Sequence, residues 1–341
     1  MTTIVIDVGG PRANALMAEG LSHFASVSST HDIFVLGKIV STQKIGEQLR
    51  QECARADYVF VAPGKISLLE IVTELGLWGK TAVLDFRDSS ELEISLLKKC
   101  RAYFKRSWPI GPKRSNRDTQ SSRLFPLNFG AFAAFERLPG TTPDLPLSRR
   151  QIDVGFYFAP DDLGNPEYVN RLRIFSRLKL NDWNHGVTKI GHHTFGSGHG
   201  EDGRRAIAGP SVDIRWIDYM RLLTQTKIIF TATPYSFDGD NRTWEALWSG
   251  ACVFMDHTGI PTPQLPRAGV ECFYYDARDE KSIDAAIELA NTLLATGGGQ
   301  ELLARIGAAG RRNLVTHHQS RHRAEYVLRL IEGGAPGDVP S

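Results

Sequence analysis

Residues 227–256 read KIIFTATPYSFDGDNRTWEALWSGACVFMD, a helical pattern between two short apolar runs. The runs predict strands at Lys227–Thr233 and Cys252–Asp256, and the residues between them predict a helix at Asn241–Ser249. Gly250 directly follows this helix, where glycine commonly ends one. A strand, a helix and a second strand in this order are typical of a parallel sheet with helices on its faces.

The predicted helix has one apolar stripe. Its members recur at i, i+3, i+4 and i+7: Trp244, Leu247, Trp248 and Ala251. Arg242 and Glu245 fall largely off this stripe. An arginine in the first turn is electrostatically unfavourable unless an anion binds there, because a helix N-terminus already carries partial positive charge. We therefore expect Arg242 and the free backbone N–H groups of this turn to clamp a diphosphate.

Glu245 does not fit the structural role that an acid near a helix start usually has. In a capping box, the acid stands three residues after the N-cap, which here would make Arg242 the cap. Arginine is a poor cap, and with Asp240 or Asn241 as the cap the third position is Thr243 or Trp244. Glu245 is then either a ligand-binding acid or an ordinary acid on the surface.

Short β-branched runs alternate with helical patterns on both sides of a break rich in Pro, Gly, Arg and Ser. We expect α/β domains at residues 1–147 and 151–332 and a flexible tail at 333–341. The strands expected in the first domain are Thr3–Val8, Ile33–Gly37, Tyr58–Ala62 and Thr81–Phe86, with helices near Pro11–Val27, Thr42–Ala56, Ser67–Leu77 and Glu91–Cys100. The second domain adds strands at Asp153–Phe158, Val187–Gly191 and Glu271–Tyr275, helices near Glu167–Lys179, Ile214–Thr224 and Glu280–Leu294, and terminal helices near Glu301–His317 and Ser320–Ile331.

The composition is that of an ordinary globular protein, with 42% hydrophobic and 23% charged residues. A net charge of +2 is too small for a broad nucleic-acid-binding surface, so we expect no nucleic-acid partner. Four scattered cysteines without a C-x-x-C pair, and an N-terminus without a basic signal region, fit the cytoplasm. No apolar run approaches the ~18 residues of a membrane-spanning helix, so any membrane contact would be peripheral, at the cytoplasmic face.

The stretch RTWEALWSGA at 242–251 resembles the R-x-x-E-A-(x)3-G signature of the donor domain in CgeB-like and family-1-like glycosyltransferases, with exostosin-like similarity. The residues YMRLL at 219–223 and KIIF at 227–230 resemble the helix and strand that precede this signature. The resemblance covers about Asp153–Asp256. It implies an α/β protein of the GT-B fold, with two Rossmann-like domains facing a cleft and helices at the C-terminus.

The same resemblance implies a glycosyltransferase whose C-terminal domain holds a nucleotide-sugar donor and whose N-terminal domain holds the acceptor. The glutamate would bond the nucleotide ribose and the arginine would lie near the phosphates, roles that fall on Glu245 and Arg242. A glycan, a lipid-linked molecule or a protein would supply the acceptor hydroxyl, as in polysaccharide biosynthesis. No cofactor or bound metal is implied, because positive side chains and a helix end serve the leaving diphosphate.

The sequence departs from the E-(x)7-E pattern of one retaining group. Asp238 stands seven residues before Glu245, and Cys252, Val253 and Phe254 follow the helix where a second glutamate is expected. The chain is therefore not assigned to that group, and the stereochemical outcome stays open.

Further donor-site candidates follow from position. Arg171 lies early in the second domain, after its first strand, where family members have an arginine; a phosphate contact and a solvent-facing helix arginine are both compatible with this place. Further candidates lie at the end of the strand expected at Lys227–Thr233, between it and the helix expected at Asn241–Ser249, or at the start of that helix: Thr233, Tyr235, Asp240 and Thr243.

Acceptor-side candidates follow the strands of the first domain, since ligands collect at the carboxyl ends of parallel strands. They are Asp7, Gly9 and Gly10 after the first strand, and Asp85, Arg87 and Asp88 after the fourth. Inverting transfer needs a general base, and we assign this role to Asp88. The alternative for Asp88 is a helix cap in the sequence Asp88-Ser89-Ser90-Glu91.

Three histidines in the run GHHTFGSGH at 191–199 suggest a metal site only superficially. No acid or cysteine completes a recognised ligand spacing, and adjacent histidines rarely ligate one ion. We expect a flexible glycine-rich loop near the donor and no metal.

Three other functions compete with glycosyl transfer. A nicotinamide dehydrogenase is disfavoured, because neither domain's first strand is followed by G-x-G-x-x-G. A nucleotide-sugar epimerase on the same fold would share the donor-binding residues. A non-catalytic sugar-nucleotide-binding or surface-assembly protein is the remaining alternative.

Overall fold

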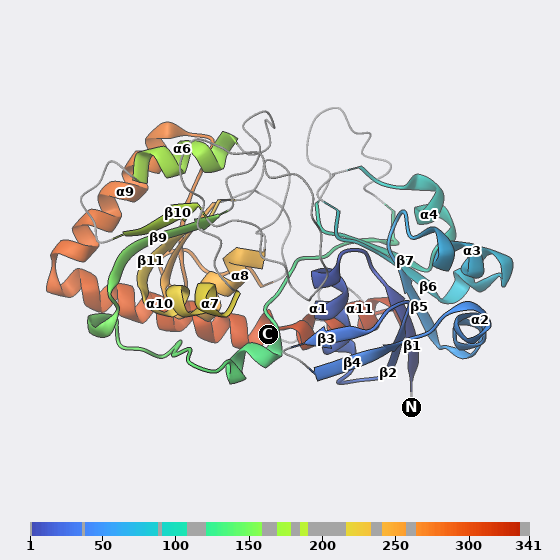
Figure 1. The fold of residues 1–341 in the computed structure, drawn as a ribbon. Helices are drawn as coiled ribbons and strands as arrows, with labels where there is room; N and C mark the ends of the chain where they lie inside the picture. Colours follow the sequence, from blue (N-terminus) through green and yellow to red (C-terminus); the bar gives the residue numbers. More distant parts are fainter. Residues whose placement is uncertain are drawn as a thin grey trace. The chain divides into compact units, whose positions relative to one another are not determined.

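A computed structural model of the chain describes residues 2–35, 38–87, 91–107, 121–158, 169–178, 185–189, 216–232, 241–256 and 264–334. Their contacts form two compact units, and each unit has its own largely parallel sheet (Figure 1). The first unit holds the elements from β1 to η2 together with α11, and the second holds those from η3 to α10.

The sheet of the first unit has the strand order β3-β4-β2-β1-β5-β6-β7-β8. Neighbouring strands are parallel, except that β3 and β4 are antiparallel. The strands are β1 (Thr3–Asp7), β2 (Ser26–Ser29), β3 (Ile33–Val35), β4 (Lys38–Gln43), β5 (Tyr58–Val61), β6 (Thr81–Asp85), β7 (Ala102–Lys105) and β8 (Leu124–Pro126). After β1 the chain builds the β2 side of the sheet and then crosses to β5, so the strand order reverses between β1 and β5.

The helices of the first unit cover this sheet: α1 (Pro11–Leu21), α2 (Gly46–Arg55), α3 (Ile66–Glu74), η1 (Leu77–Lys80), α4 (Ile94–Lys99), η2 (Ala133–Arg137) and α11 (Ser320–Ile331). Helix α11 packs against α1. A Cβ atom on Gly20 would lie 2.2 Å from the Ser320 carbonyl oxygen, so only glycine allows this approach. One core cluster includes Val5, Val59, Val83 and Tyr103.

The sheet of the second unit has the order β10-β9-β11-β12-β13, and all its pairs are parallel. Its strands are β9 (Ile152–Phe158), β10 (His185–Lys189), β11 (Thr226–Phe230), β12 (Cys252–Asp256) and β13 (Phe273–Tyr275). The rings of Phe230 and Phe254 stack at 4.7 Å in its core. The helices are η3 (Leu147–Arg149), α6 (Val169–Leu178), α7 (Trp216–Thr224), α8 (Asn241–Trp248), α9 (Glu280–Ala295) and α10 (Gly297–His317).

The unit boundaries differ from those expected in two segments. Ser320–Ile331 was expected with residues 151–332, but α11 belongs to the first unit because it packs on α1. Residues 137–147 were expected with the first domain, but they lie with the second unit. The Pro143 carbonyl there accepts a hydrogen bond from the Arg150 guanidinium at 3.0 Å, which ties this segment to the start of the second sheet.

Strand–helix alternation is confirmed in both units, and three details were wrong. The helix expected near Thr42–Ala56 begins only at Gly46, because Lys38–Gln43 form β4. Strands β2, β7 and β8 were not expected; β2 has the sequence Ser-Val-Ser-Ser, which lacks an apolar run. Helix α10 begins at Gly297 rather than near Glu301, and a Cβ atom at Gly299 would lie 2.3 Å from the Leu293 carbonyl oxygen, so glycine permits this close approach.

Candidate functional site

The carboxyl edge of the second sheet is where the donor residues were expected. Strand β11 ends at Phe230, Thr231 and Ala232 follow, and α8 begins at Asn241. The Tyr275 hydroxyl donates to the Thr231 carbonyl at 2.6 Å, and the Thr231 N–H donates to the Phe254 carbonyl at 2.9 Å. Burial raises the pKa of Tyr275 above its ordinary value, so this phenol stays protonated as a donor. The end of β11 is thereby fixed to its neighbour β12 and to β13, the next strand on the same side of the sheet.

Arg171 reaches this edge from α6. Its side chain is buried, with 7% of the residue exposed, and its Nε donates to the Ala232 carbonyl at 3.3 Å. The two residues are 61 positions apart in the chain. This contact excludes the solvent-facing alternative for Arg171 and places a guanidinium in the first turn of α6, beside the end of β11.

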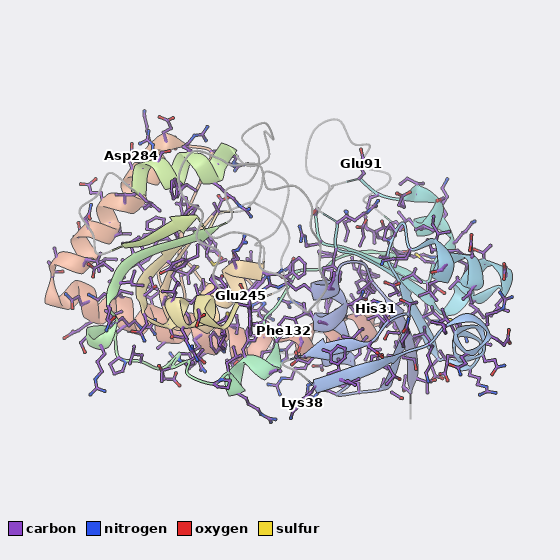
Figure 2. All side chains as sticks on the ribbon, in the orientation of Figure 1. His31, Lys38, Glu91, Phe132, Glu245 and Asp284 are labelled. Carbon is purple, nitrogen blue, oxygen red and sulfur yellow. The ribbon has the colours of Figure 1, made fainter. Side chains whose placement is uncertain are left out.

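Glu245 is buried rather than directed away from the core. Only 1% of it is exposed, and its Oε2 accepts a hydrogen bond from the Tyr219 hydroxyl of α7 at 2.9 Å. Figure 2 labels Glu245 on α8. The expectation that Glu245 falls off the buried face was wrong, because α7 covers that side of α8. The surface-acid alternative is excluded, since a buried carboxylate costs free energy unless hydrogen-bond donors surround it.

The apolar stripe of α8 is confirmed. Trp244, Leu247, Trp248 and Ala251 are each 1% exposed or less. Thr243 is also buried, whereas Arg242 in the first turn is half-buried. The two tryptophans therefore fix the helix in the core, and its first turn carries Arg242 at the carboxyl edge.

Four expected site residues lie outside the described part of the chain: Asp88, Thr233, Tyr235 and Asp240. The histidines at 192, 193 and 199 do as well. Among the described residues, no three His, Cys, Asp or Glu side chains gather as a metal site. Within the same residues, no helix is both long and apolar enough to cross a membrane.

The carboxyl edge of the first sheet brings together Asp7, Gly9 and Gly10, as expected, with four residues that the sequence analysis missed: Asn14, Thr30, His31 and Lys65. Thr30 Oγ1 donates to Asp7 Oδ2 at 2.6 Å, and the Lys65 ammonium lies 3.4 Å from Asp7 Oδ1. Gly9 has a φ of 109°, which glycine adopts readily. This cluster stands where the strand order reverses, the usual place for a ligand in such sheets.

The sequence contains only part of the information needed to find this cluster. Lys65 follows β5 and Thr30 follows β2, so each is a strand-end residue. Strand β2 was not expected, however, and without it Thr30 and His31 cannot be placed beside Asp7. A correct strand order would have been needed to find them.

Asp85 and Arg87, expected on the acceptor side, form an internal ion-pair network. Asp85 accepts from Lys105 Nζ at 3.0 Å and from the Tyr103 hydroxyl at 2.7 Å, and Arg87 Nη2 lies 2.9 Å from the same carboxylate. Asp85 and Lys105 are both fully buried. Burial alone would raise the pKa of Asp85, but the bond from Arg87 and the charge of Lys105 outweigh it and lower that pKa. The network fixes the ends of β6 and β7.

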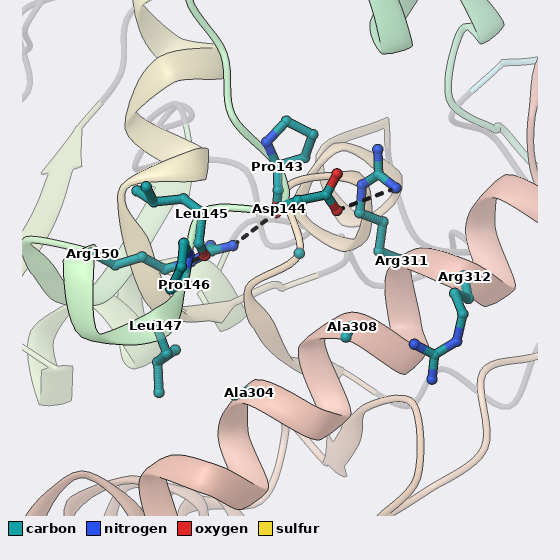
Figure 3. Close-up of a pocket in the computed structure, with 11 residues that line it drawn as sticks. Pro143, Asp144, Leu145, Pro146, Leu147, Arg150, Ala304, Ala308, Arg311 and Arg312 are labelled. Atoms are coloured by element: carbon teal, nitrogen blue, oxygen red, sulfur yellow. Dashed lines mark hydrogen bonds and ion pairs between the residues drawn. The ribbon is translucent and has the colours of Figure 1, made fainter.

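A pocket of about 350 Å³ opens at the other edge of the second sheet, where β9 and β12 begin (Figure 3). Arg150, Gly250 and Arg311 are among its lining residues. The Arg150 guanidinium donates to four backbone carbonyls, those of Pro143, Leu145, Thr226 and Ser249. Its polar atoms are therefore used in holding the chain together, and the pocket does not include the donor-site residues.

Comparisons with known proteins bear on the family and on the fold. Residues 176–329, somewhat less than half of the chain, match a family described as glycosyl transferase-like. No curated protein matches the chain in sequence.

Solved structures match over nearly the whole chain. A trehalose-6-phosphate synthase, OtsA, has a TM-score of 0.60 at 9% identity, covering 98% of this chain and 100% of its own. HepE from Anabaena, in complex with UDP and glucose, has a TM-score of 0.57 at 9% identity, covering 97% and 99%. A glycosyltransferase from Rickettsia africae has a TM-score of 0.56 at 12% identity, covering 98% and 99%. The chain therefore has the GT-B fold.

Proposed function

We propose that this chain is a glycosyltransferase that moves a sugar from a nucleotide-sugar donor to a hydroxyl group of a glycan, a lipid-linked molecule or a protein. The observation that carries the proposal is the hydrogen bond from Arg171 Nε to the Ala232 carbonyl, just after the end of β11. The chain continues from this point into α8, whose first turn contains Arg242. Two arginines in the first turns of two helices provide permanent positive charge and backbone donors, which suit a diphosphate.

In this proposal, Arg171 and Arg242 hold the phosphates of the donor, and Glu245 accepts hydrogen bonds from the ribose. The Tyr219 hydroxyl occupies one acceptor position of the Glu245 carboxylate, which has about four such positions. Thr243, Tyr235 and Asp240 complete the donor site, and Gly9 and Gly10 belong to the acceptor side. The second unit is then the donor domain and the first unit the acceptor domain.

The proposal also covers metal dependence, biological role and location. The arginines and helix N-termini neutralise the leaving diphosphate, so the reaction needs no divalent metal. A role in polysaccharide assembly, in the cytoplasm or at the cytoplasmic face of a membrane, fits a donor made from a nucleotide.

The first test is nucleotide binding without metal. We expect UDP, GDP or a related nucleotide to raise the melting temperature in the presence of EDTA, since a ligand at 100 times its Kd stabilises by about 2.7 kcal/mol. Stabilisation that requires Mg²⁺ and disappears with EDTA would contradict the metal-free donor site. Absence of any shift with all nucleotides would contradict the donor site itself.

The second test separates ligand binding by Glu245 from a purely structural role. Glu245→Gln keeps the size of the side chain but loses charge-assisted bonds, so nucleotide affinity should fall roughly ten- to a hundredfold, or about 1.5–3 kcal/mol. Tyr219→Phe is the matched variant, because it removes the hydroxyl that bonds Glu245 Oε2 and should cost stability of about 1 kcal/mol with little loss of affinity. If Glu245→Gln lowers the melting temperature and leaves affinity intact, the ribose role is refuted.

A further inference from the structure

The pocket of about 350 Å³ at the other edge of the second sheet lies between two segments of the second unit (Figure 3). One wall is helix α10, whose Ala304, Ala308 and Arg311 follow the spacing i, i+4 and i+7 and so share one face. The other wall is the segment 143–147, with the sequence Pro-Asp-Leu-Pro-Leu. Every described residue that lines the pocket belongs to the second unit.

Close packing and hydrogen bonds fix both walls of this pocket. A Cβ atom on Gly307 would lie 2.3 Å from the Gly250 carbonyl oxygen, so α10 lies directly against the turn that follows α8. Gly250 has a φ of 72°, and a Cβ atom there would lie 2.4 Å from the Pro143 carbonyl oxygen. The Arg150 guanidinium donates to the carbonyls of Pro143 and Leu145, which holds the second wall. The pocket is therefore preformed, as small-molecule sites usually are.

The pocket lining combines apolar surface with positive charge. Prolines, leucines and alanines form the apolar part, namely Pro143, Leu145, Pro146, Leu147, Ala304 and Ala308. Among the described lining residues, the charged ones are three arginines and one acid: Arg150, Arg311, Arg312 and Asp144. These side chains carry two positive charges in excess. A ligand that matches the lining has a negatively charged group attached to an apolar body.

Asp144 balances this positive charge only weakly. Its side chain is 83% exposed, and its Oδ1 lies 3.7 Å from Arg311 Nη1, which is beyond hydrogen-bond distance. An ion pair with a partner in solvent contributes little, because water and salt screen it. The side chain of Arg311 is only 16% exposed, so an anion in the pocket would meet a guanidinium from which most water is excluded. A charge-assisted hydrogen bond to such a group is strong, and an anion can therefore replace Asp144 beside Arg311.

The volume of the pocket limits the size of its ligand. A cavity of about 150 Å³ holds one benzene molecule, and this pocket is more than twice as large. Small-molecule sites begin at about 300 Å³. A bicyclic aromatic group, or an aliphatic group of similar size, therefore fits together with one carboxylate or phosphate.

We propose that this pocket binds a small organic anion in which a carboxylate or a phosphate is attached to an apolar group. Arg311 and the exposed Arg312 donate to the anion, while Arg150, which bonds four backbone carbonyls, contributes charge from behind. The apolar group lies between segment 143–147 and the alanines of α10. The ligand bridges the two walls and stabilises the second unit, because it binds only the folded form. The lining includes none of the donor-site residues, so the two sites are separate.

The test measures binding of 2-naphthoate and 2-naphthyl phosphate to the full-length protein by ligand-detected NMR titration. Each probe should bind saturably at one site, with a Kd of about 1 mM or lower. The neutral 2-naphthamide has the same ring without the charge, and inorganic phosphate has the charge without the ring. Both should bind at least about tenfold more weakly than the two probes. The ratio of the two probe affinities shows whether the natural ligand carries a carboxylate or a phosphate.

Two variants locate the binding in the pocket. Arg311→Met should weaken both probes roughly tenfold or more, because a charge-assisted hydrogen bond is lost. Ala308→Phe should abolish binding by filling the pocket, and the fold should persist because Ala308 is exposed. Arg305→Met is the matched control, since it makes the same change at an exposed arginine of α10 that does not line the pocket. The control should bind the probes like wild type, and the melting temperature of each variant verifies its folding.

The outcomes separate this pocket from the donor site. UDP should bind at the same time as either probe, and its affinity should be the same in wild type and Ala308→Phe. Three results would overturn the anion pocket: no saturable binding of the probes up to about 10 mM, equal affinity for 2-naphthamide, or unchanged affinity in both Arg311→Met and Ala308→Phe. Competition between UDP and the probes would overturn it as well, by placing the nucleotide in this pocket. Loss of UDP binding alone, with the probes still bound, would refute the donor site and leave the anion pocket in place.

Discussion

The carboxyl edges of the two sheets carry different chemistry. In the first unit, the buried Asp7 carboxylate lies in a hydrogen-bond network with Thr30 and His31, and the Lys65 ammonium lies 3.4 Å from it. In the second unit, Arg171 and Arg242 occupy the first turns of two helices, where guanidinium groups and backbone N–H groups suit an anion. In the function proposed above, the second edge holds the anionic donor and the first edge lies on the acceptor side.

The largest expected effect tests whether the buried ion pair of the first edge is structural. Lys105→Met leaves the fully buried Asp85 carboxylate without one of its partners, so the free energy of unfolding should fall by about 3–5 kcal/mol, measured by urea denaturation. Lys98→Met, at an exposed lysine of the same unit, should stay within about 0.5 kcal/mol of wild type. Equal stability of both variants would show that the pair does not hold the edge together.

The next largest effect concerns the opposite edge of the second sheet. Burial lowers the pKa of Arg150 to about 10, so its guanidinium is still protonated at neutral pH. Arg150→Met removes the donor for four backbone carbonyls, and the free energy of unfolding should fall by about 2–3 kcal/mol. Nucleotide affinity of the folded protein should not change, because Arg150 lies away from α6 and the first turn of α8. A selective loss of affinity at constant stability would move the anion site to the pocket beside Arg150.

A smaller, pH-dependent effect is expected for Asp85. Its pKa is lowered in the folded protein, so its contribution to stability is fully present above about pH 5 and is lost as the pH falls through the lowered pKa. The stability difference between wild type and Asp85→Asn should therefore be constant near neutral pH and shrink below about pH 4. A difference that grows in acid would contradict the direction assigned to this pKa.

The smallest expected effect compares two adjacent glycines of the first edge. Gly9 has a φ of 109°, so Gly9→Ala should destabilise by about 1–2 kcal/mol, whereas Gly10 has an N-cap conformation with open space, and Gly10→Ala should cost about 0.5 kcal/mol or less. Thermal unfolding of both variants measures the difference. A larger loss from Gly10→Ala would mean that the loop beside Asp7 has another conformation.

The two edges also differ in how well the sequence predicts them. The second edge was found because α8 and its flanking strands carry a strong periodic pattern, with both tryptophans at the expected buried positions. The burial of Glu245 was not predicted, since a helix pattern shows its own apolar face but not which neighbouring helix covers the opposite face. Tyr219 provides that cover from a separate helix.

The first edge was predicted less completely for a different reason. Strand β2 is polar in sequence and is a strand because it pairs with β1 and β4. Such pairing is a tertiary property, so the sequence analysis placed Ser26 and Val27 in the end of a helix and gave His31 no place beside Asp7. Helix α11 was assigned to the wrong unit for the same kind of reason, because only the packed structure shows Gly20 against Ser320.

The central claim is that the second edge binds the nucleotide and the first edge acts on the acceptor. The most direct measurement is titration calorimetry of UDP, in EDTA, with wild type, Arg171→Ala, Arg242→Ala and His31→Gln, each checked for folding by its melting temperature. We predict saturable binding by wild type, a roughly ten- to hundredfold weaker Kd in both arginine variants, and an unchanged Kd in His31→Gln. Unchanged binding in both arginine variants, together with lost binding in His31→Gln, would contradict the account.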